Sequence, residues 1–360
     1  MKALRLTGML LLVAACAKPV PDEYYTPDEE TAPVAFSLSG DLERESKITG
    51  STDVGERTVV RWAVFVFDDE DGQYVYRTSE NGNGLTVKLR VGRNYKAYAM
   101  VNYPLTGSGA LVPASVRTAD DLVNKVASLS DQKAGELMMY GSLPFYLNAG
   151  AAQVLQEKSI AVTRLVSRLD VKGISTDFSE KPQLAAKIFT LRHIYVTNVY
   201  RTSRCSSDYL PGELSSQRMA WYNTMGWHRG EPAQESLDAL LGQRNIDAVI
   251  TPSSPYTAPV SFYAFPNATP VLEDTHDTGS WRNRCTRIVL EATLDDDTYY
   301  YQITAPAMRR NYIYEAVDIV IRGLGSRDPE ERIIDPDALD VHFSISRMGW
   351  TENYEIEENS

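Results

Sequence analysis

Period-two alternation of apolar and polar residues is the feature that most limits what this chain can fold into. In residues 85–91, leucine and valine alternate with threonine, lysine and arginine, which is typical of a strand with one buried face. Residues 59–67 are apolar on nearly both faces and predict a central strand of a sandwich. The best helical signals are residues 120–129 and a short piece at 237–241. Many short strands with rare helices predict an all-β fold class built from β-sandwiches.

Turn signals join some of these strands into hairpins. The strand at 59–67 runs into an acidic Asp-Gly turn and then into a second strand at 74–76. Residues 287–294 and 299–304 flank three consecutive aspartates and predict another hairpin.

The length of the chain predicts two domains. Residues around 150 are weakly patterned, and a new set of strands starts with residues 160–174. We therefore place a boundary within residues 150–165 and expect one β-sandwich domain at 32–160 and another at 161–360.

The amino terminus predicts export as a lipoprotein. A positively charged start precedes the apolar residues 10–15, and small residues stand directly before Cys16. The apolar run is too short to span a bilayer, which needs about 20 apolar residues. We expect residues 1–16 to be a signal peptide ending at a lipidated Cys16, and the proline-rich, acidic residues 17–31 to be an extended tether. Ordinary secretion with a chance cysteine is the alternative.

Charge and cysteine content restrict the possible partners. The formal net charge is −12, which argues against nucleic acid because phosphate binding needs clustered lysine and arginine. Cys205 and Cys285 are 80 residues apart and could pair in an oxidising envelope, but spacing alone leaves the bond open.

Catalytic and metal-binding patterns are not found in the sequence. The four histidines are not at zinc-ligand spacing: His193, His228, His276 and His342. The acidic groups at 68–71 and 295–297 lack the spacing of a calcium loop and predict solvated hairpin turns. Residues 323–326 lack the Gly-Lys-Ser/Thr of a phosphate loop and predict a turn. We expect no enzyme, no catalytic residue, no metal and no cofactor.

Two amphipathic strands stand at the ends of the folded region. The first has alternating Val34, Phe36 and Leu38 and is followed by a polar, partly basic stretch. The second has an apolar series of four residues: Leu339, Val341, Phe343 and Ile345. On pattern alone, two ordinary edge strands of the sandwiches are the simplest interpretation.

Several motifs together resemble a known family. Residues 162–171 form an arginine-rich strand, and residues 309–314 read Arg-Arg-Asn-Tyr-Ile-Tyr. Residues 319–329 combine a strand with Gly-x-Gly and Asp-Pro, and a final strand ends near Trp350. With the lipoprotein signal and tether, these motifs resemble the Bacteroidia-type fimbrillins, the type V pilin family of major fimbrial subunits. The similarity is spread over the chain, but residues 201–281 have no counterpart in it.

The resemblance implies two transthyretin-like β-sandwich domains and a processed precursor. In the family, the lipid-bearing (palmitate) precursor reaches the outer membrane, and a trypsin-like protease cuts behind the first strand. Arg44 matches the position of that cut best, and Lys47 and Arg57 match it less well. The cut would release a removable first strand at 32–44.

The resemblance also implies assembly by β-strand exchange. The groove left by the first strand would accept a donor strand at about 337–350 from a neighbouring subunit. The implied partners are fimbrial subunits (copies of itself or accessory proteins), the protease, and host or bacterial surface ligands. The implied location is the cell surface, in a fimbrium, with the membrane contacted only through the lipid of the precursor.

Two other roles remain open from the sequence. Within the family, the chain could be a non-polymerising anchor or a tip accessory protein. Outside it, the chain could be a surface glycan-binding lipoprotein whose Trp221, Trp227 and Trp281 stack on sugars.

Overall fold

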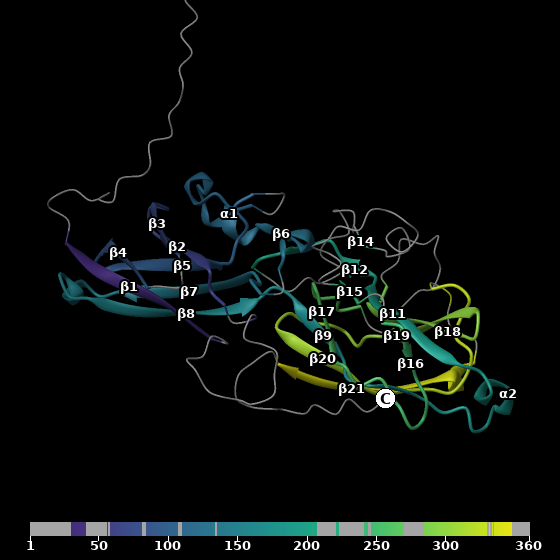
Figure 1. Cartoon of the computed structure of the whole chain (residues 1–360). Coiled ribbons are helices and arrows are strands. Elements are labelled where there is room, and N and C mark those ends of the chain that lie inside the picture. The colour runs from purple at the N-terminus through teal and green to yellow at the C-terminus, as the bar shows by residue number, and fades with distance from the viewer. Residues whose placement is uncertain are drawn as a thin grey trace, which may run out of the picture.

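The chain folds into strands arranged in two halves that lie end to end in an elongated molecule (Figure 1). The computed structural model describes residues 30–40, 56, 58–80, 84–106, 110–133, 135–206, 221–222, 241–243, 246–269, 284–329, 331, 333 and 335–347. The all-β fold class predicted from periodicity is confirmed.

The first half is one seven-stranded sheet with the order β3-β2-β5-β7-β8-β1-β4. The ladder between β7 and β8 is only two residue pairs long, so β8-β1-β4 forms a second layer over β3-β2-β5-β7. The bounds of the strands in this half are β1 (Thr31–Gly40), β2 (Arg61–Asp68), β3 (Tyr74–Glu80), β4 (Leu85–Arg90), β5 (Arg93–Val101), β6 (Val126–Ser128), β7 (Met139–Leu147) and β8 (Gln156–Arg164).

The central strand β2 is apolar on both faces because each face meets a different core. Trp62, Val64 and Val66 point into the sandwich between the two layers. Ala63 and Phe65 point to the opposite face, where they join the large core that continues into the second half of the molecule. The predicted hairpin from β2 into β3 is present.

Among the described residues, the second half contains two five-stranded sheets and a short two-stranded sheet of β12 and β14. In one, β9 and β10 pair in parallel with different parts of β20, and β17 extends the sheet beyond β9. In the other, β11 lies between β18 and the short strands β15 and β16. The bounds are β9 (Ser167–Val171), β10 (Ile174–Thr176), β11 (Phe189–Thr197), β12 (Val199–Tyr200), β13 (Thr202–Arg204), β14 (Trp221–Tyr222), β15 (Gly242–Gln243), β16 (Ala248–Val249), β17 (Val260–Ala264), β18 (Arg287–Leu294), β19 (Asp297–Thr304), β20 (Tyr312–Ile321) and β21 (Leu339–Arg347).

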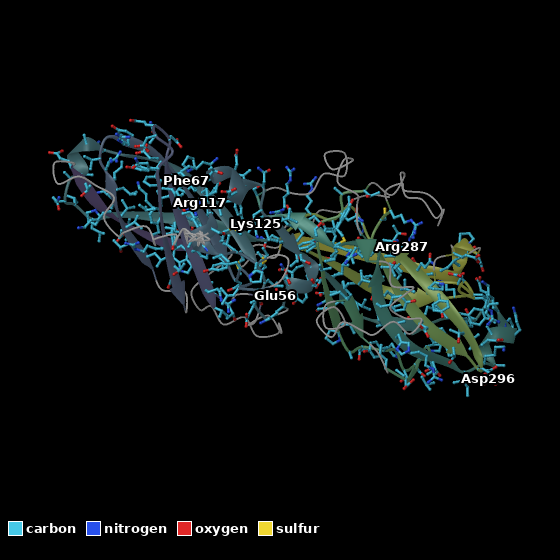
Figure 2. All side chains as sticks on the ribbon, turned by 90° about the horizontal axis from the view of Figure 1, so that it is seen from above. Glu56, Phe67, Arg117, Lys125, Arg287 and Asp296 are labelled. Atoms are coloured by element: carbon cyan, nitrogen blue, oxygen red, sulfur yellow. The ribbon has the colours of Figure 1, made fainter. Side chains whose placement is uncertain are left out.

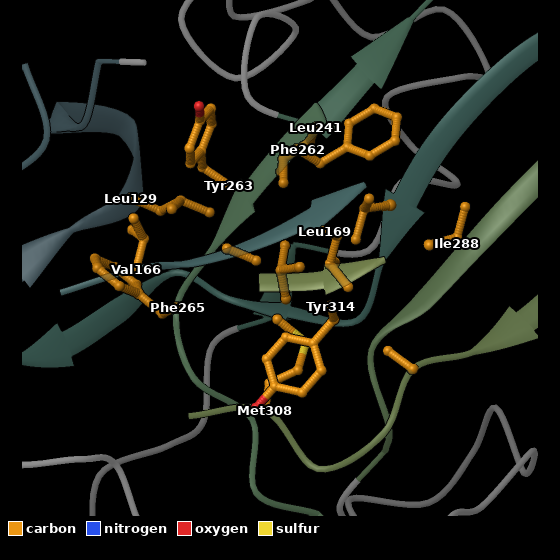
Figure 3. Close-up of a cluster of buried hydrophobic side chains, with 14 of the residues drawn as sticks. Leu129, Val166, Leu169, Leu241, Phe262, Tyr263, Phe265, Ile288, Met308 and Tyr314 are labelled. Carbon is orange, nitrogen blue, oxygen red and sulfur yellow. The ribbon is translucent and has the colours of Figure 1, made fainter. Parts of the chain in front are cut away.

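A shared apolar core and a small sheet join the two halves. Strand β6 of the first half pairs with β13 of the second. Leu129, which follows β6, packs in the same buried cluster as Val166 and Tyr263 of the second half (Figure 3). The two halves therefore share one continuous hydrophobic core at their junction.

Helices are short in the described part of the chain, and none of them is long and apolar enough to cross a membrane. The α-helices are α1 (Ala119–Val123) and α2 (Pro182–Ala185), and the 3-10 segments are Pro113–Ser115, Leu129–Asp131, Ala149–Ala151 and Pro336–Ala338.

The prediction of one long helix at 120–129 is wrong. Helix α1 starts at a capping box, in which the Thr118 side chain accepts from the backbone N–H of Asp121 and the Asp121 side chain accepts from that of Thr118. It ends at Val123 because the following residues pair with β13 as strand β6. A partner so distant in sequence overrides the local helical pattern. Of the piece at 237–241, only residue 241 lies within the described residues.

Strand β8 runs across the predicted boundary between residues 160 and 161. Its residues 156–164 all belong to the sheet of the first half, paired with β1 and then with β7. The arginine-rich segment 162–171 is therefore two strands, the end of β8 and β9, and the chain passes between the halves at Leu165 and Val166.

Candidate functional site

Strand β1 occupies an interior position in the sheet of the first half. It runs antiparallel to β4, with pairs from Thr31–Arg90 to Phe36–Leu85. It runs parallel to β8, with pairs from Val34–Gln156 to Gly40–Val162. Without β1, both neighbouring strands would present an unpaired edge, which is a template for pairing with another chain.

The inward side chains of β1 fill the core of the sandwich. Ala32 and Val34 have no exposed surface, Phe36 is 1% exposed, and Leu38 is partly buried. The Phe36 ring meets the ring of Phe145 edge-on, with 5.8 Å between centroids. The floor beneath these side chains is apolar and includes Trp62, Val64, Val66, Val87, Leu89, Ile160 and Val162. Removal of β1 would therefore open a long apolar groove.

Strand β21 lies at the edge of its own sheet in the second half. In the described part of the chain it pairs with one strand, β20, and that ladder is interrupted by a bulge between Val317 and Val320. Within the bulge, Asp318 has a φ of 52°, a left-handed conformation that costs energy for a residue with a side chain. The apolar residues of β21 are only partly buried against the core: Leu339, Val341, Phe343 and Ile345. Strand β21 therefore has fewer paired neighbours and less buried side chains than β1.

The two strands share one apolar series. Residues 34–39 read Val-Ala-Phe-Ser-Leu-Ser, and residues 341–346 read Val-His-Phe-Ser-Ile-Ser. In this alignment Val341 corresponds to Val34, and Phe343 corresponds to Phe36. Periodicity finds both strands but misses the match, which only a direct alignment of the two segments reveals.

Comparison with known proteins identifies the fold. No protein-family model and no curated protein matches the chain. Among solved structures, a candidate cell adhesion protein from Bacteroides eggerthii gives a TM-score of 0.63 at 16% identity, over 89% of this chain and 96% of that one. A fimbrilin from Porphyromonas gingivalis gives a TM-score of 0.54 at 14% identity, over 90% of this chain and 99% of that one. The chain has the fold of a fimbrilin.

A further structure with the fimbrilin fold is the tip fimbrial protein Mfa3 from Porphyromonas gingivalis, solved with a C-terminal truncation. It gives a TM-score of 0.54 at 15% identity, over 89% of this chain and 99% of that one. The fimbrillin resemblance inferred from the motifs is thus confirmed by structural neighbours from the Bacteroidales, among them a candidate cell adhesion protein, a fimbrilin and a tip fimbrial protein.

The motifs that carried the resemblance have structural roles within the fimbrilin fold. The Tyr314 hydroxyl accepts from the backbone N–H of Arg309 at 2.8 Å and donates to the Ala307 carbonyl at 3.1 Å, which fixes the turn before β20. The Arg310 guanidinium donates to the carbonyls of Cys205 and Arg204, which extend β13 at the junction. The Arg-Asn-x-x-Tyr motif therefore holds the junction and the start of β20.

The Gly-x-Gly motif allows a close approach between the backbone of its loop and that of β19. A Cβ atom at Gly325 would lie 2.5 Å from the carbonyl oxygen of Tyr300, in β19. The backbone N–H of Ser326 donates to the same Tyr300 carbonyl at 2.9 Å. Only glycine fits here, because this loop packs directly on the strand backbone.

Several predicted residues lie outside the described part of the chain. These are the lipidation residue Cys16, the candidate processing residues Arg44, Lys47 and Arg57, and also Trp227, Trp281 and Trp350. Of Trp221 only the backbone is described, as part of β14. Strand β1 itself begins at Thr31 and ends at Gly40, within the predicted removable segment 32–44 except for its first residue.

The two cysteines of the folded region do not form a disulfide. Cys205 and Cys285 are both buried, and each is a thiol. Burial raises the pKa of the Cys205 thiol to about 12, so it is protonated at neutral pH and unreactive.

The acidic hairpin turns make ion pairs with nearby cations. Arg93 contacts Asp68 at 3.1 Å and Asp71 at 3.4 Å, and Lys187 contacts Asp295 at 3.1 Å. Among the residues that the structure describes, no three His, Cys, Asp or Glu side chains converge into a metal site.

Proposed function

We propose that this protein is a structural, adhesive subunit of a fimbrium at the cell surface, and that subunits join by exchanging strands. One observation carries the proposal: the edge strand β21 repeats the apolar series of the interior strand β1, residue for residue at valine and phenylalanine. The fimbrilin fold supports the fimbrial role, and we assign the protein no catalytic activity.

The match predicts the register of the joint. With Val341 in the place of Val34, Phe343 takes the place of Phe36 and meets Phe145 of the acceptor. Side chains on one face of a strand recur every second residue, so the outward-facing serines also fall in corresponding places. Strand β21 then runs parallel to β8 and antiparallel to β4 of the acceptor, as β1 does.

The groove holds β21 better than its own sheet does. In its own chain β21 has one ladder, interrupted by a bulge, whereas the groove offers ladders to both β4 and β8. Each ladder hydrogen bond contributes about 0.5 to 1.5 kcal/mol net. Val341 and Phe343 would pass from partial to nearly full burial, as Val34 and Phe36 have, which contributes about 1 kcal/mol each. The apolar surface that β21 uncovers on its own body offsets part of this gain.

The positions of the two strands favour exchange between different subunits. Strand β1 lies in one half of the elongated molecule and β21 in the other (Figure 1). A strand from one end of a subunit that enters a groove near the opposite end of the next subunit makes a head-to-tail contact. Such contacts do not close on themselves and give filaments.

Processing would control when the groove opens. While β1 is covalently attached, it fills the groove at an effective concentration that no second chain can match. We propose that the precursor is exported with a lipid on Cys16 and that a trypsin-like protease cuts after Arg44. The cut turns β1 into a separate peptide, so its loss becomes irreversible once it diffuses away and β21 of another subunit replaces it.

The test is the cleavage product and its assembly. Treatment of the purified chain with an arginine-specific, trypsin-like protease should yield a new amino terminus at Glu45 and SDS-resistant ladders of multimers. The variant Arg44→Ala should stay uncut and monomeric, whereas the matched variant Lys47→Ala should behave as the wild type. A cut wild-type chain that remains a monomer would refute strand exchange. An Arg44→Ala chain that still starts near Glu45 would refute only the assignment of the cleavage site.

Within a fimbrium, a shaft position fits these features best. A shaft subunit needs both an acceptor groove and a donor strand, and this chain has β1 in such a groove and a β21 that matches it. A tip protein has no subunit beyond it to complement, and an anchor would keep its lipid on Cys16.

A further inference from the structure

Glu56 is a buried acidic residue at the junction of the two halves, where Figure 2 shows it in the middle of the molecule. Its side chain carboxylate contacts Arg168 of β9 at 3.0 Å and accepts from the Tyr263 hydroxyl of β17. Its backbone carbonyl accepts from the guanidinium of Arg164, at the end of β8, at 2.9 Å. Glu56 is 5% exposed, so the carboxylate is paired away from water.

The partners of Glu56 are themselves buried and fixed. Arg164 is 2% exposed and also donates to the Asn311 side chain at 3.0 Å. Arg168 is 6% exposed and lies 3.1 Å from the carboxylate of Asp170. One residue of the segment that precedes β2 is therefore tied to strands of both halves.

The backbone at Thr58 and Val60 is fixed as well. The side chain of Asn102 donates to the carbonyl of Thr58 at 2.7 Å and accepts from the backbone N–H of Val60 at 2.9 Å. Asn102 is 4% exposed and also donates to the carbonyl of Leu137 at 3.1 Å. Residue 56 on one side of Arg57, and residues 58 and 60 on the other, are thus each held by hydrogen bonds.

A protease must draw several residues on each side of the cut bond into its active site in an extended form. Cleavage therefore depends on whether the local backbone can leave its burial and its hydrogen bonds. We propose that Glu56 sets the downstream limit of processing: its contacts keep the bond after Arg57 from being cut. The role of Glu56 in assembly rests on the proposed processing, whereas the protection of the bond after Arg57 can be measured without it.

The same contacts would still hold Glu56 after a cut farther upstream. Because Glu56 stays paired with Arg168 and Tyr263, the processed chain keeps its junction closed while the groove of β1 opens. A cut after Arg57 would instead remove Glu56 and leave Arg168 buried without that carboxylate, which is costly in an apolar setting.

The experiment compares trypsin cleavage of the full chain with cleavage of three variants, with the products identified by intact mass. Glu56→Ala removes both carboxylate contacts, and Glu56→Gln keeps hydrogen bonding but loses the charge. The control Asp68→Ala removes another carboxylate that is 5% exposed and paired with an arginine, Arg93, far from the junction. With protease limiting, the rate at the bond after Arg57 follows the population of locally opened chains.

Glu56→Ala should be cut after Arg57 about 10- to 100-fold faster than the wild type, because one or two charge-assisted hydrogen bonds are lost. The cleavage rate of Glu56→Gln should lie between those of the wild type and Glu56→Ala. This variant keeps the proposal testable if Glu56→Ala does not fold. Asp68→Ala should match the wild type at this bond. Equal rates in the wild type and both Glu56 variants, or equal acceleration by Asp68→Ala, would overturn the proposal. Failure of cut chains to form multimers would bear on the proposed function and leave this result unaffected.

Discussion

Alanine substitutions of Phe36 and Phe343 should differ in their effects, and the order of the two effects should reverse after processing. In the uncut chain Phe36 is 1% exposed, so Phe36→Ala should lower the free energy of unfolding by about 3 to 5 kcal/mol. Phe343 is only partly buried against its core, so Phe343→Ala should cost the uncut chain about 1 to 2 kcal/mol. Urea unfolding of the two uncut variants measures both values.

After the cut, the two effects should exchange. Phe36 leaves with β1, so Phe36→Ala should still give multimers, and give them faster because the departing strand is held more weakly. Phe343 enters the fully buried place of Phe36, so Phe343→Ala should weaken the joint by about 3 to 5 kcal/mol. That corresponds to an affinity lower by on the order of 100-fold or more. The fraction of SDS-resistant multimers after trypsin treatment measures this effect.

The control is Val249→Ala, which trims a strand residue that is 56% exposed and should change neither measurement. The reasoning is refuted if Phe36→Ala abolishes multimers. It is equally refuted if Phe343→Ala leaves the multimers intact while destabilising the uncut chain as much as Phe36→Ala does.

Two further predictions concern the packing and capping of the first half. Gly141→Ala places a Cβ atom 2.1 Å from the Ala161 carbonyl oxygen and should lower the free energy of unfolding in urea by about 3 kcal/mol. At Gly135 an added Cβ atom would meet open space, so Gly135→Ala should leave the free energy of unfolding nearly unchanged. The backbone N–H groups of Arg117 and Thr118 hold the pKa of Asp121 below its usual value, so its capping contribution is present above the unfolded pKa and lost as pH falls through the lowered one. The protection factors of the amides at the start of α1, which compare each exchange rate with that of an unfolded chain at the same pH, should therefore fall in acid, and Asp121→Asn should remove that pH dependence.

Strand content and hairpins could be predicted from the sequence because they depend on local pattern. Residues 59–67 are apolar at successive positions, and β2 indeed serves two cores, one on each face. The hairpin of β18 and β19 follows from alternation on both sides of the aspartates. These signals need no knowledge of distant partners.

Features that depend on long-range pairing could not be predicted in this way. The pattern at 120–129 suits a helix, and only the ladder between β6 and β13 ends that helix at Val123. The role of Glu56 depends on partners from β8, β9 and β17, more than 100 residues away in sequence. Spacing in the sequence carries no information about such a convergence.

The candidate site was partly accessible to sequence reasoning. Alternation identified Val34 and Phe36 in one strand and Val341 and Phe343 in the other as candidate groove residues. It could not show that β1 is an interior strand and β21 an edge strand with a bulge in its ladder. That difference in pairing explains why β21 would gain a second ladder by moving into the groove that β1 leaves.

The measurement that tests strand exchange most directly is a disulfide across the proposed joint. In the uncut chain Ala35 of β1 pairs with Thr86 of β4, and in the proposed register His342 takes the place of Ala35. In its own chain His342 pairs instead with Val317 of β20, so a disulfide between Thr86→Cys and His342→Cys is expected only between subunits. The native Cys205 and Cys285 are buried and should not interfere.

After trypsin treatment and mild oxidation, the Thr86→Cys, His342→Cys chain should form ladders of covalent multimers that reducing agent collapses. The control pair Thr86→Cys and Ser344→Cys places the second thiol two residues out of register and should cross-link far less. Equal or stronger cross-linking by the control pair would show that the register is wrong. Multimers that form without any disulfide between residues 86 and 342 would contradict the insertion of β21 into the groove of β1.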